Sequence, residues 1–152
     1  MGPWGWKRSV DPARVLQAIQ EAERLTSGEI RVSVAPFFWG DVDKVARRAF
    51  DRLGMAGTRE RNGVLIFLVP SRRRFAVLGD SGIHDRVDQA FWDGVARCLE
   101  AQFRQGAFTQ GLEDGIRQLG QGLAQYFPPT GENELPDEVS FSPGASTRRP
   151  RT

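Results

Sequence analysis

Hydrophobic positions along the chain follow either a helical or a strand periodicity, and the two alternate, which predicts a mixture of helices and strands. Apolar residues at helical spacing follow Asp11-Pro12 and Asp41, and they recur in two later segments, about 84–104 and 112–127. Alternating apolar residues at 30–34, a continuous apolar run at 64–69 and a shorter run at 75–78 are typical of strands. The predicted order is therefore helix, strand, helix, strand, strand, helix, helix.

This order of elements also predicts how they are arranged. The first two strands flank a helix, so we expect them to be parallel with a right-handed crossover. The third strand returns after a turn at 70–73 and should form an antiparallel hairpin with the second. The predicted fold class is α/β: a three-layer α/β/α sandwich, Rossmann-like, whose small mixed sheet holds one parallel βαβ unit and one antiparallel hairpin.

Composition indicates one domain with a short extension at each end. A chain of 152 residues with 39% hydrophobic residues can bury a core. We assign residues 1–10 to an N-terminal extension, 11–138 to the domain and 139–152 to a disordered tail. The tail assignment follows from its Ser, Pro, Gly and Arg content and its lack of apolar periodicity.

The last predicted helix contains four glycines, at positions 111, 115, 120 and 122. Each costs helix stability relative to alanine. We interpret them as positions where this helix packs closely against the sheet or a neighbouring helix. Their place inside the helical pattern, not before it, argues against a loop that cradles a ligand.

Charge and hydropathy exclude several functional classes. A net charge of +2 is too small to indicate nucleic-acid binding, and the aromatic residues are not interleaved with arginines as in a base-stacking surface. The longest apolar run, 64–69, is too short to span a membrane. No apolar segment follows the basic pair at 7–8, so no signal peptide is expected. These features predict a cytoplasmic protein with no membrane span and no nucleic-acid partner.

Residues suited to nucleophilic catalysis are few. One histidine, His84, and one cysteine, Cys98, cannot form a Cys/His zinc cluster, and no nucleophile elbow, P-loop or dinucleotide fingerprint is present. Cys98 falls within a helical pattern and is interpreted as a small buried hydrophobic residue. Three arginines at 72–74 mark the hairpin tip, where such charges either contact phosphates and acidic partners or simply keep a turn solvated.

One end of the predicted sheet carries oxygen-bearing side chains. Glu29 and Asn62 come just before the first and second strands, and Asp80 follows the third, which runs in the opposite direction. These residues and the neighbouring glycines suit a hard cation, calcium in preference to magnesium, with Asp114 as an outer ligand if the last helix ends nearby. The alternative is ordinary turn chemistry, since Asn-Gly and Gly-Asp form turns. Arg61 is the obvious local cation that could neutralise the acids.

Four segments resemble the TPM domain family: SGEIRV at 27–32, TRERNGVLI at 58–66, LGDSGI at 78–83 and FRQGAF at 103–108. The resemblance covers about residues 11–138, and NELPDE at 133–138 is similar to the end of the cytoplasmic bacterial branch. It implies a Rossmann-like α/β/α fold. Plant members act in photosystem II repair in the thylakoid lumen, and one animal member assists a neurotransmitter receptor. Calcium binding and weak acid phosphatase activity are attributed to some members.

The residues and the resemblance together leave two functions open. The first is a non-enzymatic binding or accessory module that has an unidentified protein partner and that a divalent cation could gate. The second is a weak metal-dependent acid phosphatase, which would need at least two carboxylates and an open metal position in one polar cleft. The sequence favours the binding module, because few acids have a clear positional role.

Overall fold

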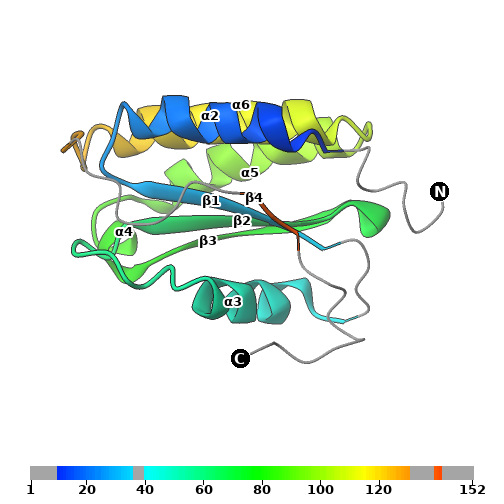
Figure 1. Ribbon diagram of the computed structural model, residues 1–152, viewed down its shortest axis with the longest axis horizontal. Helices are drawn as coiled ribbons and strands as arrows, with labels where there is room; N and C mark the ends of the chain where they lie inside the picture. The colour runs from blue at the N-terminus through cyan, green and yellow to red at the C-terminus, as the bar shows by residue number, and fades with distance from the viewer. Residues whose placement is uncertain (1–9, 36–39, 131–138, 142–152) are drawn as a thin grey trace.

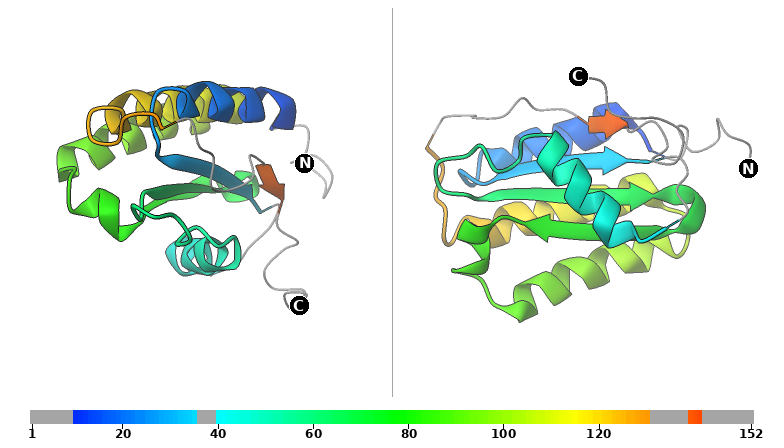
Figure 2. Two further views of the ribbon diagram at one scale, coloured as in Figure 1. Left: turned by 60° about the vertical axis from the view of Figure 1, so that its left-hand side comes forward. Right: turned by 90° about the horizontal axis from the view of Figure 1, so that it is seen from below.

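The chain folds into three layers, with a sheet between two layers of helices (Figure 1). The computed structural model describes residues 10–35, 40–130 and 139–141. Helices α2 (Pro12–Glu23), α5 (Gln89–Phe103) and α6 (Phe108–Leu123) cover one face of the sheet. Helix α3 (Val42–Arg52) crosses the other face (Figure 2). The predicted three-layer α/β/α sandwich is confirmed.

The sheet has four strands in the order β3-β2-β1-β4. The strands are β1 (Glu29–Val34), β2 (Gly63–Val69), β3 (Arg74–Gly79) and β4 (Val139–Phe141). Strands β1 and β2 are parallel across the α3 crossover, and β2 and β3 form an antiparallel hairpin closed by the short helix η1 (Pro70–Arg72). The predicted βαβ unit and hairpin are therefore both present.

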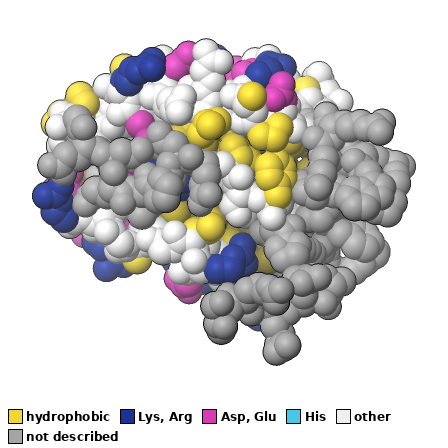
Figure 3. Space-filling model, in the orientation of Figure 1, with side chains coloured by type: hydrophobic (Ala, Val, Ile, Leu, Met, Phe, Trp, Pro, Cys, Tyr) yellow, Lys and Arg dark blue, Asp and Glu magenta, His cyan; other side chains and the backbone are white. Residues whose placement is uncertain are grey.

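Strand β4 was not predicted from the sequence. It pairs in parallel with β1, with Val139 opposite Val32 and Phe141 opposite Val34. The side chains of Val139 and Phe141 pack on the core beside α2. Hydrophobic side chains gather between α2 and this edge of the sheet (Figure 3). Residues 139–152 were expected to be a disordered tail, and that expectation is wrong for 139–141, because three residues are too few to show a strand period. Residues 142–152 and 1–9 lie outside the described residues.

The core has two halves, one on each face of the sheet. Every residue of β2 is buried, and its side chains alternate between the α2/α5/α6 layer and the α3 layer. This two-sided burial explains why β2 reads as a continuous apolar run and not as an alternating pattern.

Close packing of α6 explains its glycines. A Cβ on Gly115 would lie 2.5 Å from Leu99 Cδ2 on α5, and one on Gly120 would lie 2.8 Å from Ala22 Cβ on α2. Both approaches are closer than a methyl group allows, so the glycines let α6 sit directly against its two neighbours. The interpretation made from the sequence is confirmed.

The helix predicted at about 84–104 is present but begins later, at Gln89, and a separate single turn precedes it. Helix α4 (Ser81–His84) is a single turn, and α5 starts at Gln89, where the Asp88 side chain accepts a hydrogen bond from the Phe91 N–H. The segment between them moves the chain from the end of β3 to the outer helix layer. Asp80 caps α4, which places its carboxylate at the polar end of the sheet.

Candidate functional site

Three polar residues meet at the end of the sheet where β1 and β2 begin and β3 finishes. The Glu29 N–H donates to the Asn62 carbonyl oxygen at 3.2 Å, and the Asp80 N–H donates to the Gly63 carbonyl oxygen at 2.9 Å. Glu29, Asn62 and Asp80 are 2%, 1% and 5% exposed, so all three are buried. The predicted meeting of these residues at one end of the sheet is confirmed, while metal binding there stays a prediction.

Asp80 is held by Arg61 in a two-point ion pair. Arg61 Nε and Nη2 donate to the two carboxylate oxygens at 2.7 and 2.9 Å, and the Ser81 N–H donates to Oδ1 at 2.7 Å. Burial by itself would raise the pKa of the Asp80 carboxyl, but the hydrogen bonds from Arg61 and Ser81 and the charges of Arg61 and Arg47 outweigh it and lower that pKa below its usual value. We call this arrangement the Asp80 clamp.

The backbone geometry of Arg61 supports the clamp. Arg61 has a φ of 52°, in the left-handed region that non-glycine residues seldom adopt. Its carbonyl oxygen accepts a hydrogen bond of 2.9 Å from the N–H of Gly82, a residue of α4 that follows Asp80 in the sequence. The Arg61 loop and α4 are thus joined by side-chain and backbone hydrogen bonds together.

A second arginine forms ion pairs with the other acids nearby, and sequence reasoning did not identify it. Arg31 on β1 is buried, and its Nη1 donates to Glu23 Oε2 at 2.6 Å. Its Nη2 lies 3.9 Å from Glu29 Oε2. In the sequence, Arg31 alternates with the apolar residues of the first strand, a pattern that by itself predicts a solvent-facing side chain. The available signal was the expectation of helices on both faces, which requires even the polar positions of β1 to be covered.

Asn62 has a buried acceptor with no partner. Its N–H donates to Thr58 Oγ1 at 3.1 Å, and its side-chain Nδ2 donates to Ser27 Oγ at 3.3 Å. The Asn62 Oδ1 atom is buried and accepts no hydrogen bond within the described part of the chain. An unsatisfied buried carbonyl is costly and uncommon, so Oδ1 is the atom of this site best placed to receive a further ligand.

Asp114 does not join this group. Helix α6 does end beside the site, since a Cβ on Gly28 would lie 3.0 Å from Leu123 Cδ1. Asp114, however, lies more than two helical turns before Leu123, about 13 Å along the axis. Its carboxylate accepts hydrogen bonds from Gln110 and Arg117 on the same helix, at 2.9 and 3.1 Å. The conditional assignment of Asp114 as an outer ligand is therefore wrong.

Of the two residues that could act as nucleophile or base, His84 follows Asp80 by one helical turn, and its backbone N–H donates to the Asp80 carbonyl oxygen at 3.3 Å. The His84 ring is 5.5 Å from the Trp92 ring, at the end of α4. Cys98 is half-buried on α5, where burial and the nearby charge of Asp114 raise the pKa of its thiol and so disfavour the reactive thiolate. Among residues 10–35, 40–130 and 139–141, no three His, Cys, Asp or Glu side chains are grouped so as to hold a metal.

A βαβ unit with a returning hairpin, a three-helix layer and a polar sheet end make this an α/β domain. The model of the TPM domain matches residues 9–122, and the chain belongs to the TPM domain family. No functionally curated protein matches it. No helix in the described ranges is long and apolar enough to cross a membrane.

Solved structures agree with this assignment. The chain is similar to the BA42 protein of the psychrophilic bacterium Bizionia argentinensis, with 39% identity, a TM-score of 0.82 and coverage of 90% of this chain and 94% of that one. The N-terminal domain of the cg2496 protein from Corynebacterium glutamicum shares the fold at 14% identity and a TM-score of 0.59, covering 90% and 80%. A domain from P. gingivalis shares it at 16% and 0.61, covering 77% and 76%.

Proposed function

We propose that this TPM domain is a non-enzymatic binding or accessory module. The observation that carries the proposal is the Asp80 clamp. A metal-dependent phosphatase needs a carboxylate with an open position for the metal. Both Asp80 oxygens already accept hydrogen bonds from Arg61. This carboxylate therefore serves to join the Arg61 loop to α4.

The remaining polar groups support the same proposal. Glu23 and Glu29 share the buried Arg31, so each carboxylate has a cationic partner within the fold. Catalytic groups usually have a pKa shifted toward the pH at which they work. The Asp80 pKa is shifted further below neutrality, and the Cys98 thiol pKa is raised away from it. Both directions favour structural roles.

A phosphatase assay tests this proposal. We expect purified protein to hydrolyse a chromogenic phosphate monoester, with calcium, magnesium or manganese added, at a rate indistinguishable from Asp80→Asn. Turnover of about 1 per second or more, abolished in Asp80→Asn, would replace the binding module with an enzyme. The comparison with Asp80→Asn separates activity of this site from a contaminating phosphatase.

A divalent cation at the sheet end is a second candidate function, and the unpartnered Asn62 Oδ1 favours it. Asn62 Oδ1 and the carboxylates of Glu29 and Asp80 would hold the ion, and calcium suits such loop oxygens better than magnesium. The ion would supply charge compensation that Arg61 now provides to Asp80. Competition with the guanidinium predicts weak affinity, on the order of millimolar.

Two substitutions with opposite expected effects on calcium affinity test whether this site binds the cation. Calorimetric titration with calcium should show binding to wild type, tighter binding to Arg61→Gln, which removes the competing cation, and none to Asp80→Asn. No heat for wild type or Arg61→Gln at millimolar calcium would mean that the site is turn chemistry alone. Equal binding by Asp80→Asn and wild type would mean that the ligand assignment is wrong.

The cytoplasmic location and the protein partner expected from the sequence stay predictions. A binding module needs a surface that its partner can recognise, and the sheet end described above is mostly buried. We therefore expect the partner-binding surface to consist of exposed groups elsewhere on the domain.

A further inference from the structure

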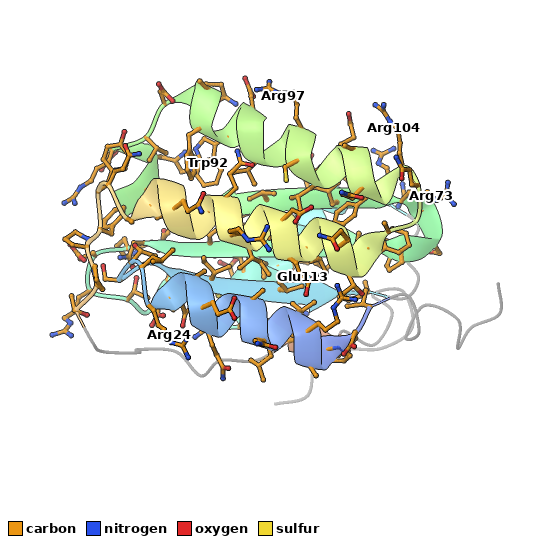
Figure 4. The ribbon with its side chains drawn as sticks, turned by 90° about the horizontal axis from the view of Figure 1, so that it is seen from above. Arg24, Arg73, Trp92, Arg97, Arg104 and Glu113 are labelled. Carbon is orange, nitrogen blue, oxygen red and sulfur yellow. The ribbon has the colours of Figure 1, made fainter. Side chains whose placement is uncertain are left out.

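A pocket of about 340 Å³ lies at the other end of the sheet, between the tip of the β2–β3 hairpin and the end of α5. It is lined by Arg73, Arg74, Phe75, Glu100, Phe103 and Arg104. We call it the hairpin pocket. Arg73 and Arg104 lie together at this end of the molecule, whereas Arg97 lies further along α5 (Figure 4).

Positive charge exceeds negative charge in the hairpin pocket. Three arginines and one acid, Glu100, line it. Arg74 pairs with Val69, which packs on the α3 layer, so its side chain leaves β3 on the face opposite Phe75. The guanidinium groups on the α5 side are those of Arg73 and Arg104. Glu100 Oε1 lies 2.8 Å from Arg104 Nη2, and both side chains are more than half exposed, so water can readily replace this pair.

Arg73 fixes the shape of the hairpin pocket. Its backbone is left-handed, with a φ of 51°, and its Nη1 donates to the carbonyl oxygen of Arg104 at 3.1 Å, just beyond the end of α5. This contact satisfies a carbonyl that the helix leaves without an internal partner, and it places a cation at the negative end of the helix dipole. The hairpin tip and α5 are thereby held together while the other guanidinium nitrogens of Arg73 stay available.

The wall between the arginines is aromatic. Phe75 and Phe103 meet edge to face with ring centroids 5.3 Å apart, and Phe75 is only partly buried while Phe103 is 1% exposed. The hairpin pocket therefore pairs fixed apolar surface with guanidinium groups. This combination suits a ligand with an aliphatic stem and an anionic end.

We propose that the hairpin pocket binds an acidic segment of a protein partner, with a glutamate carboxylate paired to Arg73 and Arg104 and its methylene groups against Phe75. The proposal rests on the proposed function, since it names the chemistry that a binding module would recognise. Arginine guanidinium groups match carboxylates through paired hydrogen bonds. The Glu100 carboxylate in the wall disfavours a doubly charged phosphate more than it disfavours a single carboxylate.

Binding of a hexaglutamate peptide tests the proposal. A fluorescein-labelled hexaglutamate should bind wild type, and the double substitution Arg73→Gln with Arg104→Gln should weaken binding about tenfold, the loss of two exposed ion pairs. In a two-dimensional amide NMR titration, unlabelled peptide should shift residues 73–75 and 100–104. Both substituted arginines are exposed, and Arg73 also donates one hydrogen bond to the Arg104 carbonyl oxygen, so the thermal midpoint of the variant should fall by no more than the loss of that bond.

A matched control removes the same charge elsewhere. Arg48 and Arg97 are exposed on α3 and α5 and lie outside the pocket lining. The double substitution Arg48→Gln with Arg97→Gln should leave hexaglutamate binding within about twofold of wild type. Equal weakening in both double variants would overturn the proposal in favour of a general charge effect.

Two further outcomes would also overturn it. Amide shifts confined to other residues would place the peptide elsewhere. Displacement of the peptide by an equal concentration of inorganic phosphate would make the hairpin pocket a phosphate site. None of these results removes the binding module as a function, whereas phosphatase turnover lost in Asp80→Asn removes it even if hexaglutamate binds as expected.

Discussion

Replacing Gly82 with alanine is expected to destabilise the domain by about 2–3 kcal/mol, the upper part of the usual cost of overpacking. A Cβ on Gly82 would overlap the Glu60 carbonyl oxygen and lie 2.7 Å from that of Arg61. Both are backbone atoms of a loop that is tied to α4 by the Asp80 clamp. They can move only if the clamp opens, so the strain cannot be relieved by rotating a side chain.

Urea unfolding monitored by circular dichroism measures this effect, with Gly94→Ala as the matched control. Gly94 lies inside α5, and the nearest atom to its Cβ would be Gln118 Nε2 at 3.0 Å, the far end of a flexible side chain. The alanine should therefore stabilise the protein by up to about 1 kcal/mol through helix propensity. If Gly82→Ala were as stable as wild type, α4 and the Arg61 loop would not be in the close contact described here.

Replacing Asp80 with alanine is expected to cost about 1–2 kcal/mol at pH 7. The change removes the acceptor for the Ser81 N–H at the start of α4, a loss of the kind that helix caps show. It also leaves Arg61 without its carboxylate partner. Asp85→Asn is the control, because Asp85 is exposed on the same turn of chain. A change of stability in Asp80→Ala no larger than in Asp85→Asn would contradict the clamp.

The dependence of this effect on pH follows from the direction of the Asp80 pKa. Its pKa in the folded protein is lowered from the ordinary 3.8, so the folded state favours the ionised carboxylate. The resulting stabilisation is fully present above the unfolded pKa and is lost as the pH falls through the folded pKa. The stability difference between wild type and Asp80→Asn should therefore be constant from pH 7 to pH 5 and decrease below about pH 4.

The order and class of the elements could be predicted because their signals are local. The caps at Asp11 and Asp41, the continuous run of β2 and the turn before β3 each belong to one short stretch of sequence. The chain connections then restrict the topology to few solutions. Strand β4 could not be predicted, because its stability comes from pairing with β1, more than a hundred residues earlier, and not from its own pattern.

The candidate site was predicted in its location but not in its chemistry. Topology alone brings Glu29, Asn62 and Asp80 to one end of the sheet. Which cation pairs with each acid depends on side-chain geometry, which the sequence does not give. The role of Arg31 beside Glu29 was therefore missed. The suspected role of Arg61 is established by the distances of 2.7 and 2.9 Å from its nitrogens to the Asp80 carboxylate oxygens.

The hairpin pocket shows a similar limit of sequence reasoning. The arginines at the tip are evident in the sequence, but the wall formed by Phe103 and Arg104 comes from the end of α5, about thirty residues later. A basic turn becomes a pocket only when tertiary packing places a second element beside it.

The proposed function depends on Asp80 being held as a structural carboxylate. A carbon-13 NMR titration of the Asp80 side-chain carboxyl measures this directly. The midpoint should lie below the ordinary 3.8 in wild type, and it should rise in Arg61→Gln, where burial persists without the guanidinium. A wild-type midpoint at or above 3.8, unchanged in Arg61→Gln, would show that Arg61 does not hold the carboxylate and that Asp80 is available for other chemistry.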